Sequence, residues 1–166
     1  GKKDLSSVTC VVSGGDTLIP SFKKKVDEFL KEHGSSAQIR CGYGLTEGTA
    51  ASCLNPRTEY RDNSIGIPLP DMLYKIVKIG TVDTAKTMED GEICICGPTV
   101  MMGYLNNREE TDKTLIKHKD GKLWLHTGDI GCMDKDGFIY FKQRLKRMIV
   151  SSGYNIYPSY IEDIIS

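Results

Sequence analysis

Val8-Thr9-Cys10-Val11-Val12-Ser13-Gly14-Gly15 starts as a β-branched run and ends in two glycines, the pattern of a strand followed by a tight turn. Pro20 fits the first turn of a helix that ends at His33-Gly34, and the apolar residues between them recur at helical spacing: Phe22, Val26, Phe29 and Leu30. Gln38–Tyr43 is predicted to be a second strand, and Gly44–Glu47 a turn. Because a strand, a helix and a strand form a crossover unit, we expect a parallel pair in an α/β sheet.

The pattern changes from about Asn63, where short candidate strands are separated by Gly, Pro, Asp and Asn. These strands are Tyr74–Ile79, Glu92–Cys96, Leu123–His126, Ile130–Met133 and Phe138–Lys142. Glu109–Ile116 is predicted to be a short helix, and Asp134–Gly137 has the composition of a hairpin turn. This spacing predicts an antiparallel, barrel-like sheet.

The fold class is therefore α/β, with three parts along the chain. Residues 1–60 are predicted to be the end of a parallel-sheet α/β subdomain, and residues 61–142 a small antiparallel β-barrel-like subdomain. Residues 143–166 are predicted to be a hinge and the start of a truncated C-terminal α+β domain, because Pro158–Ile165 begins a helix too short to be stable alone. The chain also starts without Met, so we expect it to be an internal piece of a longer protein.

Composition excludes several classes of function. Lys and Arg balance Asp and Glu at 22 each, so no global field recruits nucleic acid or anionic lipid. The apolar stretches are too short to span a bilayer, and no secretory signal is present, so we expect a cytoplasmic protein with reduced cysteines. Cys94 and Cys96 share one face of a predicted strand, but no histidine pair has matching spacing, so we expect no metal site there.

The turn Gly42–Gly48 combines an aromatic ring, a hydroxyl and a carboxylate between glycines. Tyr43 could stack on a base, Thr46 could bond a phosphate, and Glu47 could hold Mg²⁺ through oxygen. The alternative is that Thr46 caps a helix and Glu47 is a solvated carboxylate in its first turn. The residues alone leave both interpretations open.

Three further segments are candidates for chemistry. Gly14-Gly15 allows a flat ligand to approach the backbone, or simply makes a tight turn. Asp129 lies between small residues, where it could accept both hydroxyls of a ribose or hold a turn. Arg144–Arg147 carries three basic residues shortly before Ser151-Ser152-Gly153, which is typical of an interdomain hinge or of a solvated edge.

Taken in order, these segments resemble the adenylate-forming superfamily of acyl-CoA synthetases, luciferases and peptide-synthetase adenylation domains. The resemblance extends from Val11 to Ile164. Its motifs are Tyr43–Glu47, Gly91–Pro98 with Gly103–Asn106, His126–Asp129, Arg144–Lys146 and Gly153–Pro158. Single motifs of this kind often mislead, but an ordered set of them is specific.

The resemblance implies two half-reactions: a carboxylate attacks the α-phosphate of ATP to give an acyl-adenylate, and a thiol then takes the acyl group. It implies that one set of residues borders the adenine: Gly14, Gly15, Asp16, Tyr43 and Gly44. Thr46 would contact the α-phosphate and Glu47 would bind Mg²⁺ as the catalytic residues, while Asp129 and Arg144 would hold the ribose. Lys146 would be the hinge residue, and Gly153 would line the thiol channel.

The stretch Val150–Pro158 looks like the acyl-CoA synthetase version, which implies a fatty or other organic acid, ATP and coenzyme A as substrates. The alternatives are a non-catalytic nucleotide-binding module and a peptide-synthetase adenylation domain. The family's phosphate loop and C-terminal catalytic lysine lie outside this chain, so we expect the chain alone to be inactive. We also expect the exposed apolar faces to cause dimerisation or aggregation.

Overall fold

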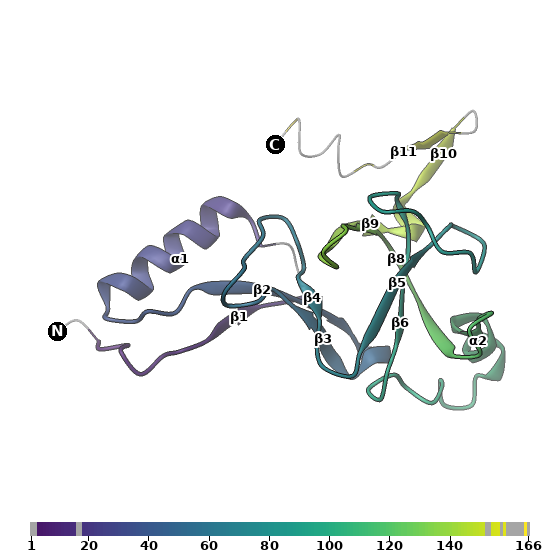
Figure 1. Ribbon diagram of the computed structural model, residues 1–166, viewed down its shortest axis with the longest axis horizontal. Helices are drawn as coiled ribbons and strands as arrows, with labels where there is room; N and C mark the ends of the chain where they lie inside the picture. The colour runs from purple at the N-terminus through teal and green to yellow at the C-terminus, as the bar shows by residue number, and fades with distance from the viewer. Residues whose placement is uncertain (1–2, 16–17, 152–153, 157, 159–164, 166) are drawn as a thin grey trace.

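The computed structural model describes residues 3–15, 18–151, 154–156, 158 and 165 (Figure 1). Its elements form two adjoining lobes. The first lobe holds the helix α1 and the strands β1 to β4, and the second holds the helix α2 and the strands β5 to β9. Within the described residues, no helix is long and apolar enough to cross a membrane.

The first lobe contains the predicted crossover. Strand β1 (Val11–Ser13) pairs in parallel with β2 (Ile39–Leu45), and α1 (Pro20–Glu32) connects them. The helix ends where predicted, because Gly34 adopts a φ of +87°, which glycine tolerates best. Its apolar stripe is not all buried, however: Leu30 is buried, whereas Phe22 and Phe29 are each more than half exposed.

Two strands of the first lobe were not predicted. β3 (Ala50–Leu54) pairs antiparallel with β2, and β4 (Ile67–Pro68) pairs antiparallel with β3, giving the order β1-β2-β3-β4. The 3₁₀ turn η1 (Thr46–Gly48) joins β2 to β3. A Cβ atom at Gly44 would lie 1.8 Å from the carbonyl oxygen of Ala50, so this close approach of the two strands requires glycine.

The second lobe is a mostly antiparallel sheet, as predicted. Its strands are β5 (Leu73–Val77), β6 (Gly91–Cys96), β7 (Leu115–Lys117), β8 (Leu123–Met133) and β9 (Ile139–Arg144). The order is β5-β6-β8-β7, with β9 paired to the second half of β8. The described strands form an open sheet, so the barrel-like arrangement expected for residues 61–142 is not confirmed.

Strand β8 runs unbroken through the Thr127-Gly128-Asp129 segment, where the sequence predicted two separate strands. Gly128 adopts a φ of +69°. The pairing with β6 shifts register between Glu92 and Cys94, and the pairing with β9 shifts between Ile130 and Gly131. These bulges absorb the irregular segment without ending the strand.

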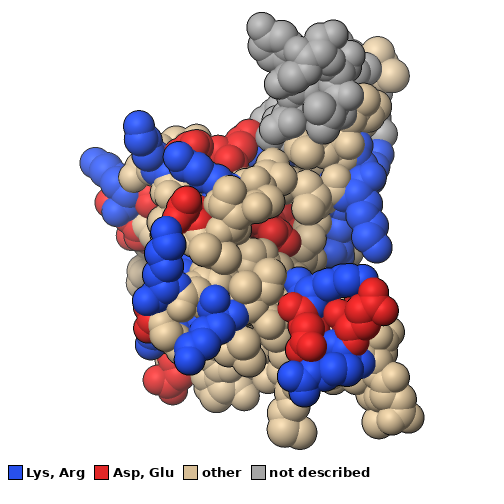
Figure 2. Space-filling view, turned by 90° about the vertical axis from the view of Figure 1, so that its right-hand side faces the viewer, with Lys and Arg blue, Asp and Glu red and all other residues tan. Residues whose placement is uncertain are grey.

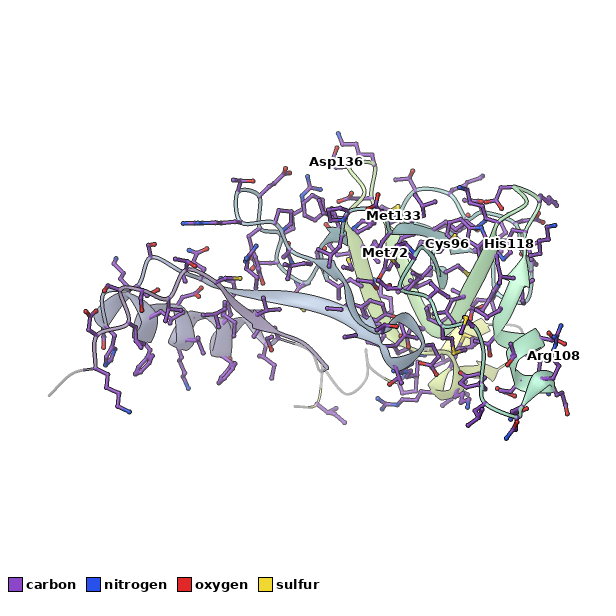
Figure 3. The ribbon with its side chains drawn as sticks, turned by 90° about the horizontal axis from the view of Figure 1, so that it is seen from below. Met72, Cys96, Arg108, His118, Met133 and Asp136 are labelled. Atoms are coloured by element: carbon purple, nitrogen blue, oxygen red, sulfur yellow. The ribbon has the colours of Figure 1, made fainter. Side chains whose placement is uncertain are left out.

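Helix α2 (Arg108–Thr114) is shorter than predicted, because the chain turns into β7 at Leu115. The side chain of Asn107 accepts a hydrogen bond from the backbone N–H of Glu110 and caps the helix. Arg108 lies on the outer side of the lobe (Figure 3), where it pairs with Asp112. Acidic and basic side chains lie side by side on this face (Figure 2), which agrees with the balanced charge of the sequence.

One apolar core joins the two lobes. Cys41, Cys53 and Ile65 of the first lobe belong to the same buried cluster as residues of the second. The second-lobe members are Met72, Tyr74, Ile76, Ile93, Ile95, Leu115, Leu125 and Ile139. Burial of this shared core fixes the lobes relative to each other.

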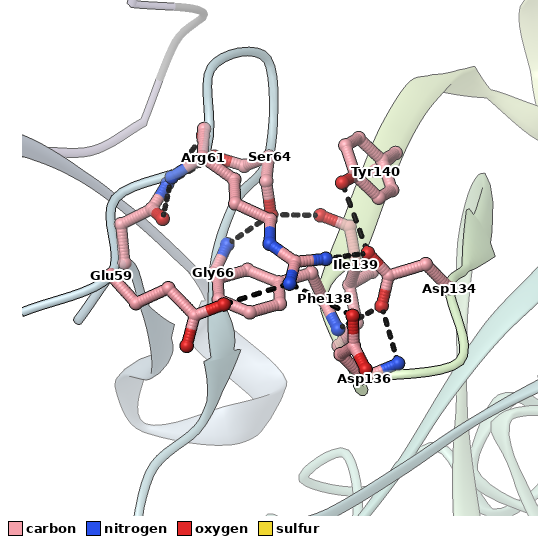
Figure 4. A network of polar contacts seen from close by, with 10 residues as sticks. Glu59, Arg61, Ser64, Gly66, Asp134, Asp136, Phe138, Ile139 and Tyr140 are labelled. Atoms are coloured by element: carbon pink, nitrogen blue, oxygen red, sulfur yellow. Dashed lines mark hydrogen bonds and ion pairs between the residues drawn. The ribbon is translucent and has the colours of Figure 1, made fainter.

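A polar cluster around Arg61, here called the Arg61 clasp, also links the lobes (Figure 4). Arg61 pairs with Asp134 and Asp136 of the β8–β9 hairpin, and its guanidinium lies 4.0 Å from the centre of the Phe138 ring. Close by, the backbone N–H of Ile139 donates to the carbonyl of Gly66 at 2.9 Å. The predicted hairpin turn Asp134–Gly137 is confirmed, since Asp134 N donates to Phe138 O and Gly137 N to Asp134 O.

Beyond β9, the 3₁₀ turn η2 (Leu145–Arg147) leads to a small antiparallel pair, β10 (Ile149–Ser151) and β11 (Tyr154–Ile156). This pair forms a separate two-stranded sheet among the described residues, and the predicted change of unit after residue 142 stays a prediction. Asp16, Gly153 and most of the helix predicted over Pro158–Ile165 lie outside the described residues.

Candidate functional site

An open pocket of about 680 Å³ lies at the carboxyl ends of β1 and β2. Its lining residues are Val12, Gly14, Gly15, Gly42, Tyr43, Gly44, Leu45, Thr46, Thr49, Ala50 and Ala51. Ligands of open α/β sheets bind at this edge of parallel strands. A smaller pocket of about 190 Å³, near Arg40 and Tyr60, contains none of the predicted site residues.

Tyr43 and Asp129, which come from different lobes, meet at this site. The Tyr43 hydroxyl donates a hydrogen bond to Oδ2 of Asp129 at 2.5 Å, across 86 residues of sequence. The Tyr43 ring lies at the edge of the shared core, 6.5 Å from the Tyr74 ring and 6.4 Å from the Phe141 ring between centres. The two residues predicted to hold the base and the ribose are therefore adjacent.

Asp129 is buried and keeps one oxygen without a hydrogen bond. Only 1% of its surface is exposed. Nη1 of Arg144, its partner across the β8–β9 ladder, lies 2.9 Å from Oδ1, but the contact is not aligned as a hydrogen bond. Within the described residues, Oδ1 is thus a buried acceptor with no hydrogen-bond donor, which a ligand hydroxyl could supply.

The charge states of this pair follow from their surroundings. Burial raises the pKa of Asp129 above its ordinary value, although the hydrogen bond from Tyr43 and the charge of Arg144 act in the opposite direction. Burial and the neighbouring Asp129 carboxylate raise the pKa of Tyr43. Tyr43 is therefore a protonated donor at neutral pH, and Asp129 is its acceptor.

Thr46 and Glu47 lie in η1, next to the pocket. Thr46 is exposed and is not a helix cap, because Leu45 occupies the cap position and makes no side-chain hydrogen bond there. Oε1 of Glu47 accepts a hydrogen bond from the Tyr104 hydroxyl at 2.7 Å, and the Glu47 carbonyl accepts one from Met101 N at 2.7 Å. Those contacts fix the turn and engage one of the two carboxylate oxygens of Glu47.

The other predicted residues are placed as follows. Gly14, Gly15 and Gly44 line the pocket together with Tyr43 and Thr46. Arg144 reaches the site through Asp129 but remains 57% exposed, and Lys146 is exposed in η2. The positions of Asp16 and Gly153 are outside the described residues.

Sequence analysis missed two residues that support the site, Tyr104 and Glu92. Tyr104 fixes Glu47, and Glu92 accepts hydrogen bonds from Gly128 N at 2.9 Å and from Nδ1 of His126 at 2.8 Å. Both residues lie in motifs on which the resemblance rests, Gly103–Asn106 and Gly91–Pro98. Their spacing along the chain, however, did not indicate what they contact. Their roles depend on pairing between distant strands.

Strand pairing also brings together a set of metal-ligating side chains that spacing did not predict. Cys94 faces His126 across the β6–β8 ladder, and ligand atoms of Glu92, Cys94 and His126 lie within 4.8 Å of one another. Both Glu92 oxygens already accept hydrogen bonds, and burial raises the pKa of the Cys94 thiol. In this structure Glu92 and His126 are thus joined by a hydrogen bond, and the Cys94 thiol beside them is neutral at neutral pH.

Comparison with known proteins gives consistent matches. A protein family described as AMP-binding enzyme matches residues 1–105. A long-chain-fatty-acid–CoA ligase of Salmonella typhimurium is 45% identical over 98% of this chain and 27% of that protein, and a luciferin 4-monooxygenase of Luciola mingrelica is 37% identical over 99% and 28%. O-succinylbenzoate coenzyme A synthetase of Bacillus subtilis, solved with ATP and magnesium, has a TM-score of 0.76 at 29% identity, over 99% of this chain and 32% of that one. The chain thus spans less than a third of the length of the curated relatives it matches.

Proposed function

This chain belongs to the family of AMP-binding enzymes, and we propose that it is part of an ATP-dependent acyl-CoA ligase. In the proposed reaction, a carboxylate oxygen attacks the α-phosphorus of ATP and displaces pyrophosphate, giving an acyl-adenylate. The thiol of coenzyme A then attacks the acyl carbon and displaces AMP. The hydrogen bond between Tyr43 and Asp129 at the edge of the pocket carries this proposal, because it assembles an aromatic ring and a ribose acceptor from two lobes.

The residues of the pocket suit the adenosine part of ATP. We assign Gly14 and Gly15 to the approach of the base, since glycines let a flat ring lie close to the backbone. The Tyr43 ring provides an apolar face for the base while its hydroxyl orients Asp129. Oδ1 of Asp129 accepts a ribose hydroxyl, and Arg144 keeps that carboxylate ionised.

Thr46 and Glu47 suit the phosphate side. Thr46 is exposed next to the pocket, so its hydroxyl is available to an α-phosphate oxygen. The Tyr104 hydroxyl orients Glu47, whose remaining carboxylate oxygen is the ligand type that Mg²⁺ prefers. Mg²⁺ bound with ATP neutralises charge that develops on the phosphates.

Two residues after β9 are assigned to the second half-reaction. Lys146 lies exposed in η2, between the β-rich lobe and the separate β10–β11 pair, where a hinge would allow the following domain to rotate. Gly153 is assigned to the thiol channel on the sequence resemblance alone. The chain itself is expected to bind nucleotide weakly and to be inactive without further catalytic groups.

Binding of AMP to this chain, measured by titration calorimetry, tests the nucleotide site. We expect Asp129→Ala to weaken binding about 10-fold or more, since it removes a charged hydrogen-bond partner. Asp120→Asn, in the exposed turn after β7, should leave binding unchanged. Equal affinity of Asp129→Ala and wild type would disprove the assignment of Asp129.

The proposed reaction is tested by assaying the longest natural protein that carries this chain. We expect pyrophosphate release that depends on an organic acid, followed by a thioester on addition of coenzyme A. Transfer to a carrier-protein thiol would instead identify a peptide-synthetase adenylation domain. AMP binding without pyrophosphate release for any acid would identify a non-catalytic nucleotide-binding module.

A further inference from the structure

The carboxylate of Glu92 lies under the segment that carries Asp129. Its Oε1 accepts from the backbone N–H of Gly128 at 2.9 Å, and its Oε2 accepts from Nδ1 of His126 at 2.8 Å. Glu92 is buried, with 8% of its surface exposed. A buried carboxylate whose two oxygens are both engaged is held in one orientation, so it also fixes its donors.

The Thr127-Gly128-Asp129 segment needs such support because it is irregular. Gly128 has a φ of +69°, and the β6–β8 ladder shifts register beside it. Thr127 supports the segment from the other side: its Oγ1 donates to Ile93 O at 2.7 Å and accepts from Asp129 N at 3.1 Å. The Glu92–Gly128 and Thr127–Ile93 bonds therefore hold the backbone of the segment, while Tyr43 and Arg144 contact the Asp129 carboxylate itself.

Two histidines continue the chain of hydrogen bonds behind Glu92. Nε2 of His126 lies 2.9 Å from Nε2 of His118, and such a bond holds one proton between the two nitrogens. With Nδ1–H of His126 donating to Glu92, the neutral pair has His118 donating through Nε2–H. A second proton on the pair would put an N–H on Nδ1 of His118, which is buried and has no partner among the described residues.

The surroundings of His118 favour its neutral form on balance. His118 is buried, with 5% of its surface exposed, and its ring stacks on Trp124 at 5.8 Å between centres. Burial, Lys75 of β5 and His126 lower the pKa of His118, while Asp120 and Glu92 oppose them. The other facing groups are the Cys94 thiol and Lys75, which lies 4.0 Å from the centre of the Trp124 ring. Figure 3 shows His118 in the second lobe, at the end away from α1.

We propose that Glu92 is a positioning residue for the nucleotide: it holds the Gly128 N–H so that Asp129 faces the ribose, and the hydrogen-bonded His126–His118 pair holds Glu92. This inference rests on the proposed function, since it assumes that Asp129 binds a ribose. Glu92, His126 and His118 do not touch the nucleotide themselves. They act through the backbone of β8. Their role is therefore to place the Asp129 carboxylate, and they take no part in the chemical steps of the reaction.

The test compares variants of Glu92 in the longest natural protein that carries this chain. We expect Glu92→Ala to raise the KM for ATP about 10-fold or more, with a smaller change in kcat, because loss of the charged acceptor frees the Gly128 turn. Glu92→Gln should restore most of the affinity. Its amide oxygen can still accept from Gly128 N.

The histidines are tested by substitution. His118→Phe keeps the stack on Trp124 and removes the hydrogen bond to His126. It should raise the KM for ATP by less than Glu92→Ala does, because the bond from Glu92 to Gly128 N remains. Asp134→Asn, which is expected to destabilise the β8–β9 hairpin and lies outside the Gly128 turn, is the control for lost stability and should keep the wild-type KM.

Amide hydrogen exchange at Gly128 separates the two levels of the proposal. If wild type binds no nucleotide, the proposed function fails, and faster exchange of Gly128 in Glu92→Ala still decides whether Glu92 holds the turn. Nucleotide binding that is equal in wild type and Glu92→Ala overturns the inference and leaves the proposed function intact. Stoichiometric zinc that is lost in Cys94→Ser but kept in Cys96→Ser would also overturn it, because the cluster would then be a metal site.

Discussion

Asp129 combines burial with an incomplete set of partners. It has a donor in Tyr43, an ion pair with Arg144 and one oxygen without a hydrogen bond in the described part of the protein. Such a residue costs stability in the folded chain, since burial disfavours its charge. Residues that destabilise a fold while keeping a buried acceptor without a hydrogen bond are typical of binding sites.

Neutralising Asp129 should therefore stabilise the protein. The pKa of Asp129 is higher in the folded protein than in the unfolded chain, so its ionised carboxylate destabilises the fold. This destabilisation is full above the folded-state pKa and disappears as pH falls towards the unfolded value of 3.8. We expect Asp129→Asn to raise the melting temperature at pH 7 by about 2–4 °C, which corresponds to about 1 kcal/mol for a domain of this size. The difference from wild type should shrink with falling pH in thermal unfolding scans; a lower melting temperature at every pH would contradict the argument.

At the scale of elements, strand pairing brings together the residues of the site, each of which has only a weak local signal in the sequence. The sequence predicted a break at Thr127–Asp129, because glycine and aspartate there resemble a turn. Instead β8 continues, paired with β6 on one side and with β7 and then β9 on the other. Asp129 thereby comes opposite Arg144, and Gly128 comes within reach of Glu92.

The β8–β9 hairpin provides a second prediction at this scale. Burial of Asp134 favours its neutral form, but hydrogen bonds from Phe138 N, Asp136 N and Tyr140, together with the charge of Arg61, outweigh it and lower its pKa below 3.8. We expect Asp134→Asn to lower the free energy of unfolding by about 1–2 kcal/mol at neutral pH, measured in urea. The stabilisation that comes with a lowered pKa is present above pH 3.8 and is lost as the pH falls below that value. The difference in unfolding free energy between wild type and Asp134→Asn should therefore narrow in acid.

Asp136→Asn is the matched control for this hairpin. Asp136 also pairs with Arg61, but its side chain is 46% exposed, so a much smaller loss is expected. Equal losses for the two variants would show that the turn itself, and not the Asp134 carboxylate, connects the hairpin to the Arg61 clasp.

At the scale of the molecule, apolar side chains are exposed on the first lobe. Ile19, Phe22 and Phe29 are each more than half exposed, and the two phenylalanines are seven residues apart on α1, which puts them on one face. A large exposed apolar patch promotes association. The residues of the shared core and of the Arg61 clasp, by contrast, make their contacts with each other inside the chain.

We predict that this chain self-associates through the α1 face. Phe22→Ser combined with Phe29→Ser should reduce the weight-average mass in sedimentation towards that of a monomer. Met102→Ser removes an apolar side chain that is fully exposed in a separate loop, so it should leave association unchanged. A monomeric wild type at micromolar concentration would refute the prediction.

Local physical chemistry was enough to predict the crossover of β1, α1 and β2, the end of α1 at Gly34 and the Asp134–Gly137 turn. These features depend on backbone preference and side-chain type over a few neighbouring residues. The exposure of Phe22, the unbroken course of β8, the open sheet and the Glu92–Gly128 bond required the tertiary structure. The reason is that Tyr43 and Asp129 are 86 residues apart, and Glu92 and Gly128 are 36 apart, so only strand pairing and the shared core determine which of them meet.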